Sequence, residues 1–430
     1  MMCSALSYAQ RQTLQLGTAH VVGQTTTAPC NFPVQGADAW YYHDDPTRTS
    51  CSNVMVTGCA TQGNPNNPLP TLLAYVAVTY QPAGTSQGTV VLLDGDGGTS
   101  FFNSGDGTNQ YVDDYYRNGH FTTVQFAWAA AWNDNTANPP PSVKSVKDEA
   151  CRPATLLKYI HDNYAVSSTG AMCAQGHSGG ASAIAYAMEF YGADRAVSGG
   201  YLDTVVMTSG PTLADIYNGC HYDPQGSQAA ASNVCQGGVC VGSAPQWQAC
   251  LEHAMGGQVN CFPDGDPNRA LYQNDGRYGT ARAVAMHTVG INNLALGHAN
   301  CNNWKQTGLD THSGGIDDAW RDMSLVPVPY GHYPQTFVYG FLCEGPKFMV
   351  DDQGFRWDIS NSSAAQAWSY LSAISPSPSQ GTLPAIYRVN KCEDPEMIWK
   401  PHSDAVGSGM SGYGASEDAM VNNCNTTHRE

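Results

Sequence analysis

A serine flanked by glycines lies at residues 176–180, between an apolar segment typical of a strand and an Ala-rich segment typical of a helix. A serine hydroxyl is a weak nucleophile at its own pKa, so it needs an exposed position beside a general base. A sharp strand-to-helix turn gives that exposure, and glycines two residues before and after the serine let strand and helix pack closely. The pattern therefore predicts Ser178 as a nucleophile, against the alternative of a purely structural turn.

The same spacing occurs once more, at residues 84–88 around Ser86. This second copy falls in a polar turn before a strand-like segment, and no helical pattern follows it. Residues 181–191, which follow Ser178, place apolar side chains at helical spacing. The context of each motif therefore favours Ser178 over Ser86.

Composition excludes several classes of partner. Lys and Arg number 19 against 36 Asp and Glu, which leaves a formal net charge of -17. Such an acidic chain is not expected to bind nucleic acid or an anionic membrane surface. No apolar run reaches the ~18 residues that a membrane span needs. We expect a monomer that acts on a small or polymeric substrate and needs no cofactor.

Fifteen cysteines are unusual for a reducing compartment, and their spacing does not resemble a zinc cluster. Disulfides in a secreted protein are the better interpretation, and residues 7–9 would suit cleavage of a signal peptide. The odd count leaves a free thiol, for which Cys173 and Cys3 are equal candidates. Nearby cysteines could form local bridges: Cys30 with Cys51 or Cys59, Cys235 with Cys240, and Cys250 with Cys261.

Strand-like and helix-like segments alternate through much of the chain. This alternation, with nearly continuous apolar strands, predicts an α/β fold with a mostly parallel sheet covered by helices on both faces. We expect an irregular, cysteine-bearing extension at residues 1–70. The expected strands are 72–80, 89–93, 121–128, a strand ending at 175, 201–208, 336–342 and 385–389, and the expected helices are 143–164, 181–191 and 364–374.

The alternation stops between the two parts of the predicted core, residues 71–210 and 336–430. The stretch 211–335 holds many Asn, Gly and Asp residues and only short helical patterns. An insertion at this point would lie over the ends of the strands, where substrates bind in open α/β sheets. We interpret it as a disulfide-bearing cap, with a surface excursion as the alternative.

With Ser178 in its turn, residues 70–410 resemble the α/β-hydrolase superfamily, in particular its serine esterase and lipase branch. The resemblance implies the chain order nucleophile, acid, histidine, each at the carboxyl end of a successive strand. His402 follows the last expected strand and is the implied general base. Glu344, just beyond the strand at 336–342, is the implied acid, and Asp351 and Asp352 remain alternatives.

The resemblance also implies two backbone N–H groups that stabilise a developing oxyanion. One is that of Gly179, directly after the nucleophile. The other comes from the acidic turn at residues 94–98, where Asp96 is the first candidate and Gly97 the second. A calcium site in this turn, or at residues 264–268, is an alternative interpretation, although neither has the spacing of an EF-hand and no metal is expected.

These features predict a secreted serine esterase that cleaves carboxylic esters through an acyl-enzyme. Trp128 and Trp132 follow the strand whose loop borders the site in this fold, and with His177 they are the expected substrate contacts, so that an aromatic or polymeric ester, such as a polyester, would fit. Core packing is the other interpretation of the two tryptophans. A serine peptidase of the same fold and a non-catalytic binding protein remain competing functions.

Overall fold

The structure is a computed structural model of the full chain. It describes residues 13–25, 30, 32–33, 46–61, 64–95, 97–102, 109–133, 146–165, 170–195, 198–208, 210–211, 214, 235–236, 239–240, 324–325, 333, 335–343, 348–350, 356–358, 367, 370–371, 373–374, 386–389 and 411–424.

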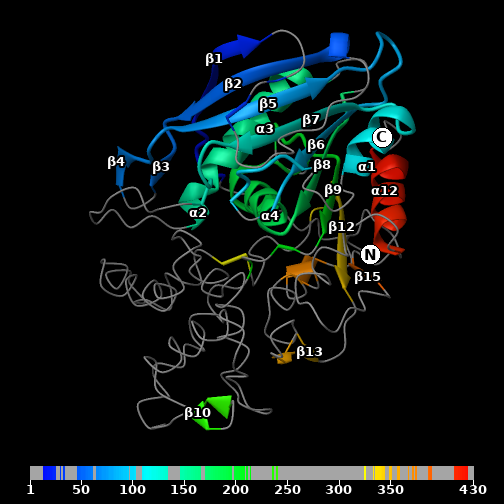
Figure 1. Ribbon diagram of the computed structural model, residues 1–430. Helices are drawn as coiled ribbons and strands as arrows, with labels where there is room; N and C mark the ends of the chain where they lie inside the picture. Colours follow the sequence, from blue (N-terminus) through cyan, green and yellow to red (C-terminus); the bar gives the residue numbers. More distant parts are fainter. Residues whose placement is uncertain are drawn as a thin grey trace, which may run out of the picture.

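A nine-stranded sheet forms the centre of the described structure, in the spatial order β1-β2-β5-β7-β6-β8-β9-β12-β15 (Figure 1). The six strands from β7 to β15 run parallel, whereas β1, β2 and β5 join by antiparallel pairing. The strands are β1 (Thr18–Thr25), β2 (Thr49–Thr57), β5 (Leu72–Thr79), β6 (Thr89–Leu93), β7 (Thr122–Trp128), β8 (Met172–His177), β9 (Thr204–Thr208), β12 (Phe337–Cys343) and β15 (Ile386–Val389).

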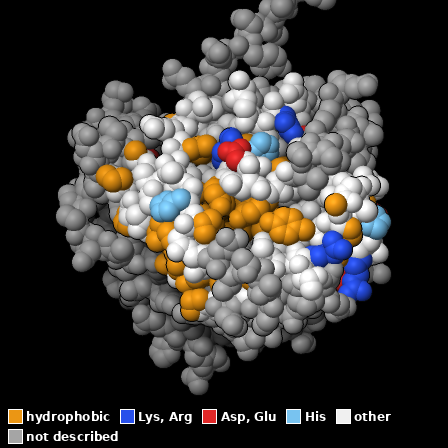
Figure 2. Space-filling view, turned by 90° about the horizontal axis from the view of Figure 1, so that it is seen from above, with side chains coloured by type: hydrophobic (Ala, Val, Ile, Leu, Met, Phe, Trp, Pro, Cys, Tyr) orange, Lys and Arg blue, Asp and Glu red, His pale blue; other side chains and the backbone are white. Residues whose placement is uncertain are grey.

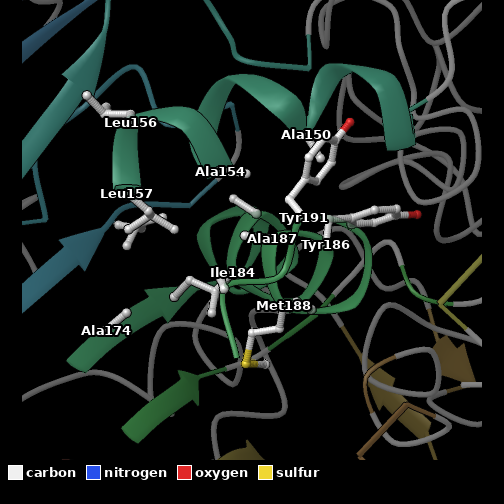
Figure 3. Packing of buried hydrophobic residues seen from close by; sticks show 14 of the residues in the cluster. Ala150, Ala154, Leu156, Leu157, Ala174, Ile184, Tyr186, Ala187, Met188 and Tyr191 are labelled. Atoms are coloured by element: carbon white, nitrogen blue, oxygen red, sulfur yellow. The ribbon is translucent and has the colours of Figure 1, made fainter. Parts of the chain in front are cut away.

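Helices cover both faces of this sheet. On one face α3 (Cys151–Tyr164) and α4 (Gly179–Tyr191) pack together, and every described side chain of α4 is buried (Figure 3). On the other face α1 (Asn109–Arg117) and α12 (Ser411–Asn423) contribute Tyr115 and Met420 to a second apolar cluster. The strands between them are buried on both sides, which is why they read as continuous apolar runs.

Most predicted elements are present within a few residues of their expected bounds. The predicted helix at 143–164 is divided into α2 (Val146–Glu149) and α3, and residues 367, 370, 371, 373 and 374 are helical within the range expected for a later helix. The expected mostly parallel sheet, with helices on both faces, is confirmed. The short elements are a 3-10 turn at Pro46–Arg48, β3 (Ala60–Thr61), β4 (Asn64–Pro68), β10 (Cys235–Gln236), β11 (Val239–Cys240), β13 (Phe348–Val350) and β14 (Arg356–Asp358).

The interpretation of residues 1–70 as an irregular extension is wrong for two segments. β1 and β2 are strands of the main sheet, and β2 pairs along its whole length with β5. In β2 the buried and half-buried side chains nearly alternate. Polar residues alternating with apolar ones are compatible with a strand near a sheet edge, where one side is partly solvated.

β1 is an edge strand whose register shifts between Val21 and Gly23. Val21 and Val22 are among the few exposed large hydrophobic side chains of the described residues, at 41% and 52%. Figure 2 shows the molecule from above, the side on which β1 lies in Figure 1. Apolar side chains gather across the described part of that face, and few of its side chains are charged. A bulge twists an edge strand and so discourages pairing with another chain.

Three disulfides join described residues, and they correct part of the expected pairing. Cys30 bonds Cys51, as one of the two alternatives predicted. Cys59 bonds Cys151 and Cys173 bonds Cys424, so the interpretation of Cys173 as a free thiol is wrong. The remaining expected pairs lie in a region where only the β10 and β11 cysteines are described, and those two face each other across the short ladder.

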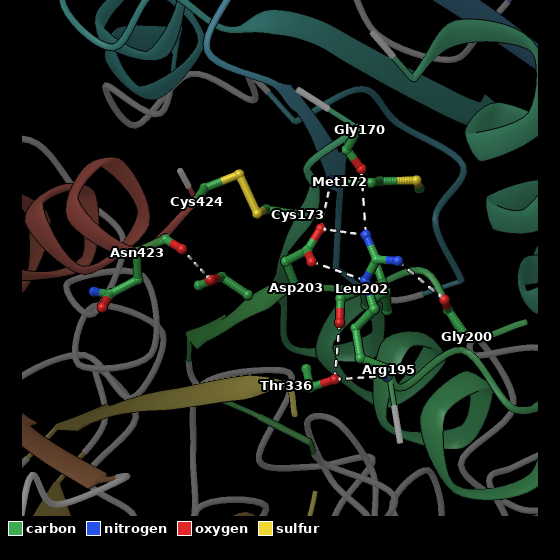
Figure 4. A network of polar contacts seen from close by, with 11 residues as sticks. Gly170, Met172, Cys173, Arg195, Gly200, Leu202, Asp203, Thr336, Asn423 and Cys424 are labelled. Carbon is green, nitrogen blue, oxygen red and sulfur yellow. Dashed lines mark hydrogen bonds and ion pairs between the residues drawn. A yellow bond between two sulfur atoms is a disulfide. The ribbon is translucent and has the colours of Figure 1, made fainter. Parts of the chain in front are cut away.

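The amino ends of β8 and β9 are held by a polar network (Figure 4). Arg195 donates to both carboxylate oxygens of Asp203, at 2.8 and 2.9 Å, and Asp203 also accepts the Met172 N–H at 2.9 Å. Beside it, the Cys173–Cys424 disulfide ties β8 to the end of α12. Charged groups inside a protein are tolerated when they are paired and hydrogen-bonded, as here.

The cap expected at 211–335 falls almost wholly outside the described residues. Its role therefore stays a prediction. In the part of the chain that the structure describes, no helix is both long and apolar enough to span a membrane.

Candidate active site

Ser178 occupies the sharp turn between the end of β8 and the start of α4. Its backbone has φ 52° and ψ -112°, and among the described non-glycine residues only Ser178 and His120 have positive φ. Such a conformation costs of order 1–3 kcal/mol and persists only where the surroundings enforce it. The Ser178 N–H donates to the Thr208 carbonyl oxygen at 2.9 Å, and the Ser178 carbonyl oxygen accepts the Ser182 N–H at 3.1 Å.

Glycines make this turn possible because strand, helix and loops approach it at backbone distance. A Cβ added to Gly176 would lie 2.6 Å from the Ala181 nitrogen. One added to Gly180 would lie 2.4 Å from the Leu93 carbonyl oxygen, at the end of β6. No side chain fits at either position without moving backbone, so both glycines of the motif are required by packing.

The turn after β6 lies directly beside Ser178. A Cβ built on Gly95 would be 3.3 Å from the Ser178 Cβ. The turn closes on itself through a hydrogen bond from the Gly98 N–H to the Gly95 carbonyl oxygen, at 2.9 Å. The loop expected to supply an oxyanion donor therefore reaches Ser178, because β6 and β8 are neighbours in the sheet.

Two tryptophans fix the far side of this turn. The Trp128 N–H donates to the Gly98 carbonyl oxygen at 2.7 Å, and the Trp132 N–H donates to the Gly97 carbonyl oxygen at 3.0 Å. Both indoles are 1% exposed and belong to the main apolar core. The packing interpretation of these residues thus describes their contacts, while contact with a substrate stays a prediction.

The N-terminus of α4 lies directly after Ser178. The first N–H groups of a helix have no acceptor within the helix, and the helix dipole favours negative charge there. Gly179, the first residue of α4, was predicted as an oxyanion donor and stands directly after Ser178. Gly97, the alternative donor, lies across the turn against Ala131.

His177, the last residue of β8, is half-buried between the neighbouring strands. Its Nδ1 lies 3.3 Å from the Thr208 hydroxyl oxygen, and its Cδ2 lies 3.1 Å from the Cβ position of Gly95. Burial lowers the pKa of His177 to about 4, while a hydrogen bond with the Thr208 backbone acts in the opposite direction. The imidazole is therefore neutral at ordinary pH.

Several predicted site residues lie outside the described residues. These are the predicted base His402, the predicted acid Glu344 with its alternatives Asp351 and Asp352, and the predicted oxyanion donor Asp96. Their roles stay predictions. The turn at 94–98 was expected near Ser178, and Gly95 lies there. Thr208 was missed as a neighbour of Ser178, and its only sequence signal is its position at the end of a predicted strand.

The competing serine is placed differently. Ser86 precedes β6 and so lies at the amino ends of the parallel strands, whereas Ser178 lies at their carboxyl ends. The Ser86 hydroxyl donates to the Gly88 carbonyl oxygen at 2.8 Å. It is therefore a turn-stabilising residue. Of the two calcium alternatives, residues 264–268 and Asp96 of the turn at 94–98 lie outside the described residues. Within the described ranges no group of three or more His, Cys, Asp or Glu side chains could hold a metal.

The class of fold follows from topology and turn together. Counted from β2, the strands lie in the order 1-2-4-3-5-6-7-8, the second is antiparallel to its neighbours, and a serine sits in a strained turn between the fifth strand and its helix. This is the topology of the α/β-hydrolase fold, in which a sharp turn of this kind joins the fifth strand to its helix.

Comparison with known proteins gives similarity of structure only. No family model and no curated protein matches the sequence. The chain is similar to EstE1, a thermostable carboxylesterase cloned from a metagenomic library, at 9% identity and TM-score 0.38 over 87% of this chain and 88% of that one. It is similar to bacterial brefeldin A esterase at 13% identity and TM-score 0.38, over 91% of this chain and 81% of that one. Mouse α/β-hydrolase domain-containing protein 10 gives 10% identity and TM-score 0.36, over 82% of this chain and 92% of that one. The strand order and the Ser178 turn, rather than these low scores, define the fold.

Proposed function

We propose that the protein is a serine hydrolase that cleaves carboxylic esters through an acyl-enzyme. The observation that carries this proposal is the strained backbone of Ser178, with its positive φ, at the carboxyl end of β8. The turn that follows the neighbouring strand β6 lies beside it. Strained backbone of this kind persists only where the surroundings enforce it, and it clusters at active sites. Ser86 lies in a motif of the same spacing, but it is not one of the described residues with a positive φ.

In the proposed reaction the Ser178 hydroxyl attacks the ester carbonyl carbon, and His402 takes its proton. The C–O bond to the leaving alcohol then breaks, and His402 returns the proton to the alcohol oxygen. Water repeats the sequence on the acyl-enzyme. Glu344 would hold the imidazole of His402 in the tautomer that accepts the serine proton.

The oxyanion of each tetrahedral intermediate would lie between the α4 N-terminus and the turn after β6. Gly179 and Asp96 would donate their backbone N–H groups, with Gly97 in place of Asp96 as the alternative. Preorganised donors of this kind contribute strongly because they do not reorient during the reaction, and removing one typically costs about 100- to 1,000-fold in turnover.

Labelling with a serine-directed phosphonate tests the nucleophile. We expect one phosphonate per chain, on Ser178, and loss of ester hydrolysis by at least about 1,000-fold in Ser178→Ala. Ser86→Ala is the matched control, because it removes a serine hydroxyl from the second copy of the motif, which lies at the amino ends of the parallel strands. Labelling of Ser86, or no labelling of a folded protein, would reject the proposal.

The acid is tested by three single variants. We expect Glu344→Gln to lower turnover by about 10⁴-fold, since a neutral partner leaves the histidine in the wrong tautomer. Asp351→Asn and Asp352→Asn should then have little effect. Near-normal turnover in Glu344→Gln together with loss in one aspartate variant would move the acid to that aspartate.

A substrate panel tests the class of bond and the place of action. We expect cleavage of short acyl, aromatic and polymeric esters to exceed cleavage of peptide bonds. Faster hydrolysis of peptides would favour a serine peptidase of the same fold, and a folded protein that binds esters without turnover would favour a binding protein. The three disulfides support secretion, because such bonds persist in oxidising compartments.

A further inference from the structure

Thr208, at the carboxyl end of β9, contacts three consecutive residues of the neighbouring strand and turn. Its carbonyl oxygen accepts the Ser178 N–H at 2.9 Å, its hydroxyl donates to the Gly176 carbonyl oxygen at 3.3 Å, and the same hydroxyl lies 3.3 Å from His177 Nδ1. The side chain is fully buried. Thr208 therefore contacts the end of β8, the imidazole ring of His177 and the strained turn at Ser178.

The Thr208 hydroxyl fixes which edge of the His177 ring faces β9. This hydroxyl can donate its one proton to the Gly176 carbonyl oxygen, and its oxygen lies 3.3 Å from His177 Nδ1. The Nδ1 edge of the ring therefore faces β9.

The opposite edge of the ring faces β6. The atom nearest to the Cβ position of Gly95 is His177 Cδ2, at 3.1 Å. Because β8 lies between β6 and β9 in the sheet, the ring spans the top of β8 from the Thr208 hydroxyl to the Gly95 backbone. Replacement by a small side chain would remove the contact between the ring and Gly95.

We propose that His177, oriented by Thr208, is a positioning residue that sets the distance between Ser178 and the turn after β6, and so the placement of the oxyanion donor. This inference rests on the proposed function and gives His177 a role other than substrate contact. A donor acts fully only at 2.7–3.1 Å from the oxyanion, and a misplacement of about 1 Å can cost about 100-fold in rate. The effect is therefore expected in turnover rather than in substrate binding.

One pair of variants of the full-length protein tests the hydrogen bond of the Thr208 hydroxyl. Thr208→Val removes the hydroxyl and keeps the shape, and we expect kcat for a chromogenic ester to fall about 10- to 100-fold while KM changes less than about threefold. Thr208→Ser keeps the hydroxyl and should restore most of the turnover. Thr204→Val is the matched control, since Thr204 lies at the other end of β9 and its hydroxyl donates to the Asn423 carbonyl oxygen at 2.8 Å.

His177→Ala and His177→Asn test the ring. Asparagine offers a donor close to the position of Nδ1 but lacks the edge that faces Gly95, so both variants should lose turnover if the ring supports the turn. The second readout is the ratio of kcat for an ester to kcat for its thionoester. Because sulfur accepts hydrogen bonds poorly, this ratio depends on the oxyanion donors, and we expect it to fall toward one in His177→Ala and Thr208→Val but not in Thr204→Val.

Failure of this inference differs from failure of the proposed function. Without Ser178-dependent ester hydrolysis in the unmodified protein, the proposed function is wrong and the inference falls with it. If hydrolysis depends on Ser178 while folded His177→Ala keeps the unmodified kcat and thionoester ratio, only the positioning role is overturned. Should Thr208→Val fail to fold, Thr208→Ser and the two His177 variants still decide between the outcomes.

Discussion

The two ends of β8 and β9 are held by different means. At the amino ends, side chains of opposite charge pair, and a disulfide ties β8 to α12 (Figure 4). At the carboxyl ends, glycine contacts and backbone hydrogen bonds hold Ser178 in a strained conformation. The ion pair and the disulfide thus lie at the amino ends of these strands, and the strained residue lies at the carboxyl end of β8.

This contrast separates two kinds of substitution. Changes at the amino ends should alter the free energy of unfolding and leave the geometry of Ser178 intact. Changes at the carboxyl ends should reduce turnover more than stability, because small shifts matter for a reacting atom. The first three of the four predictions below test this separation, and they begin with the largest effect.

Gly180→Ala is expected to have the largest effect. The added methyl would lie 2.4 Å from the Leu93 carbonyl oxygen and 2.6 Å from that of Asp94, so α4 and the end of β6 must move apart. We expect kcat/KM for an ester to fall at least about 100-fold with a folded protein. Gly23→Ala, which meets only the Asn53 side chain at 3.3 Å, is the control, and equal losses in both variants would contradict the contrast.

Removal of the Cys173–Cys424 disulfide by a double substitution to alanine should chiefly affect stability. The bond closes a sequence separation of 251, and loops of about 100 residues or more contribute around 4–5 kcal/mol in the chain-entropy model. Removal of Cys30–Cys51, with a separation of 21, should cost less. Urea unfolding measures both, and loss of turnover in the folded Cys173/Cys424 variant would show that the two ends of β8 are coupled.

Asp203→Asn should lower the free energy of unfolding by about 2 kcal/mol, since it weakens charge-assisted bonds from Arg195 at a partly buried position. The control is Asp113→Asn, which breaks an exposed ion pair with Arg117 one helical turn away and should cost about 0.5 kcal/mol or less. Equal costs in chemical denaturation would mean that the Arg195–Asp203 pair contributes no more than a surface pair.

Glu417 on α12 is expected to give a small pH dependence of stability. Burial, and then the nearby carboxylates Asp114 and Asp418, raise its pKa from 4.5 to about 7. The folded protein thus holds this proton more tightly than the unfolded chain, so the contribution is complete below about pH 4.5 and is lost as pH rises through about 7.

Glu417→Gln should remove that slope. Melting temperatures of the variant and the unmodified protein should diverge between pH 5 and 8, with the variant relatively more stable at the higher pH. Asp418→Asn is a partial control, because it removes only one of the neighbouring charges. A constant difference across this range would contradict the assigned origin of the shift.

Local patterns in the sequence were sufficient for much of the fold. The apolar runs at β6, β7 and β8 identify strands because buried parallel strands need apolar side chains on both faces. Ser178 could be located because the glycines on either side of it are a local requirement of its turn. The Cys30–Cys51 bond was among the predicted pairs, since its cysteines are close in sequence.

Long-range contacts were decided by the tertiary structure. The bond between Cys173 and Cys424 joins residues 251 positions apart, and no local pattern encodes such a distance. β1 and β2 were missed because their mixed polar sequence gains its strand conformation from pairing along β5.

The sequence by itself thus determined the strand and helix types of the core and the identity of the strained serine, because both depend on neighbours along the chain. Only the tertiary structure decided what surrounds Ser178. Gly95 and Thr208 reach it from β6 and β9 because the sheet places those strands on either side of β8. Strand order arises from packing of the whole sheet and its helices, and that packing brings together side chains that are remote in sequence.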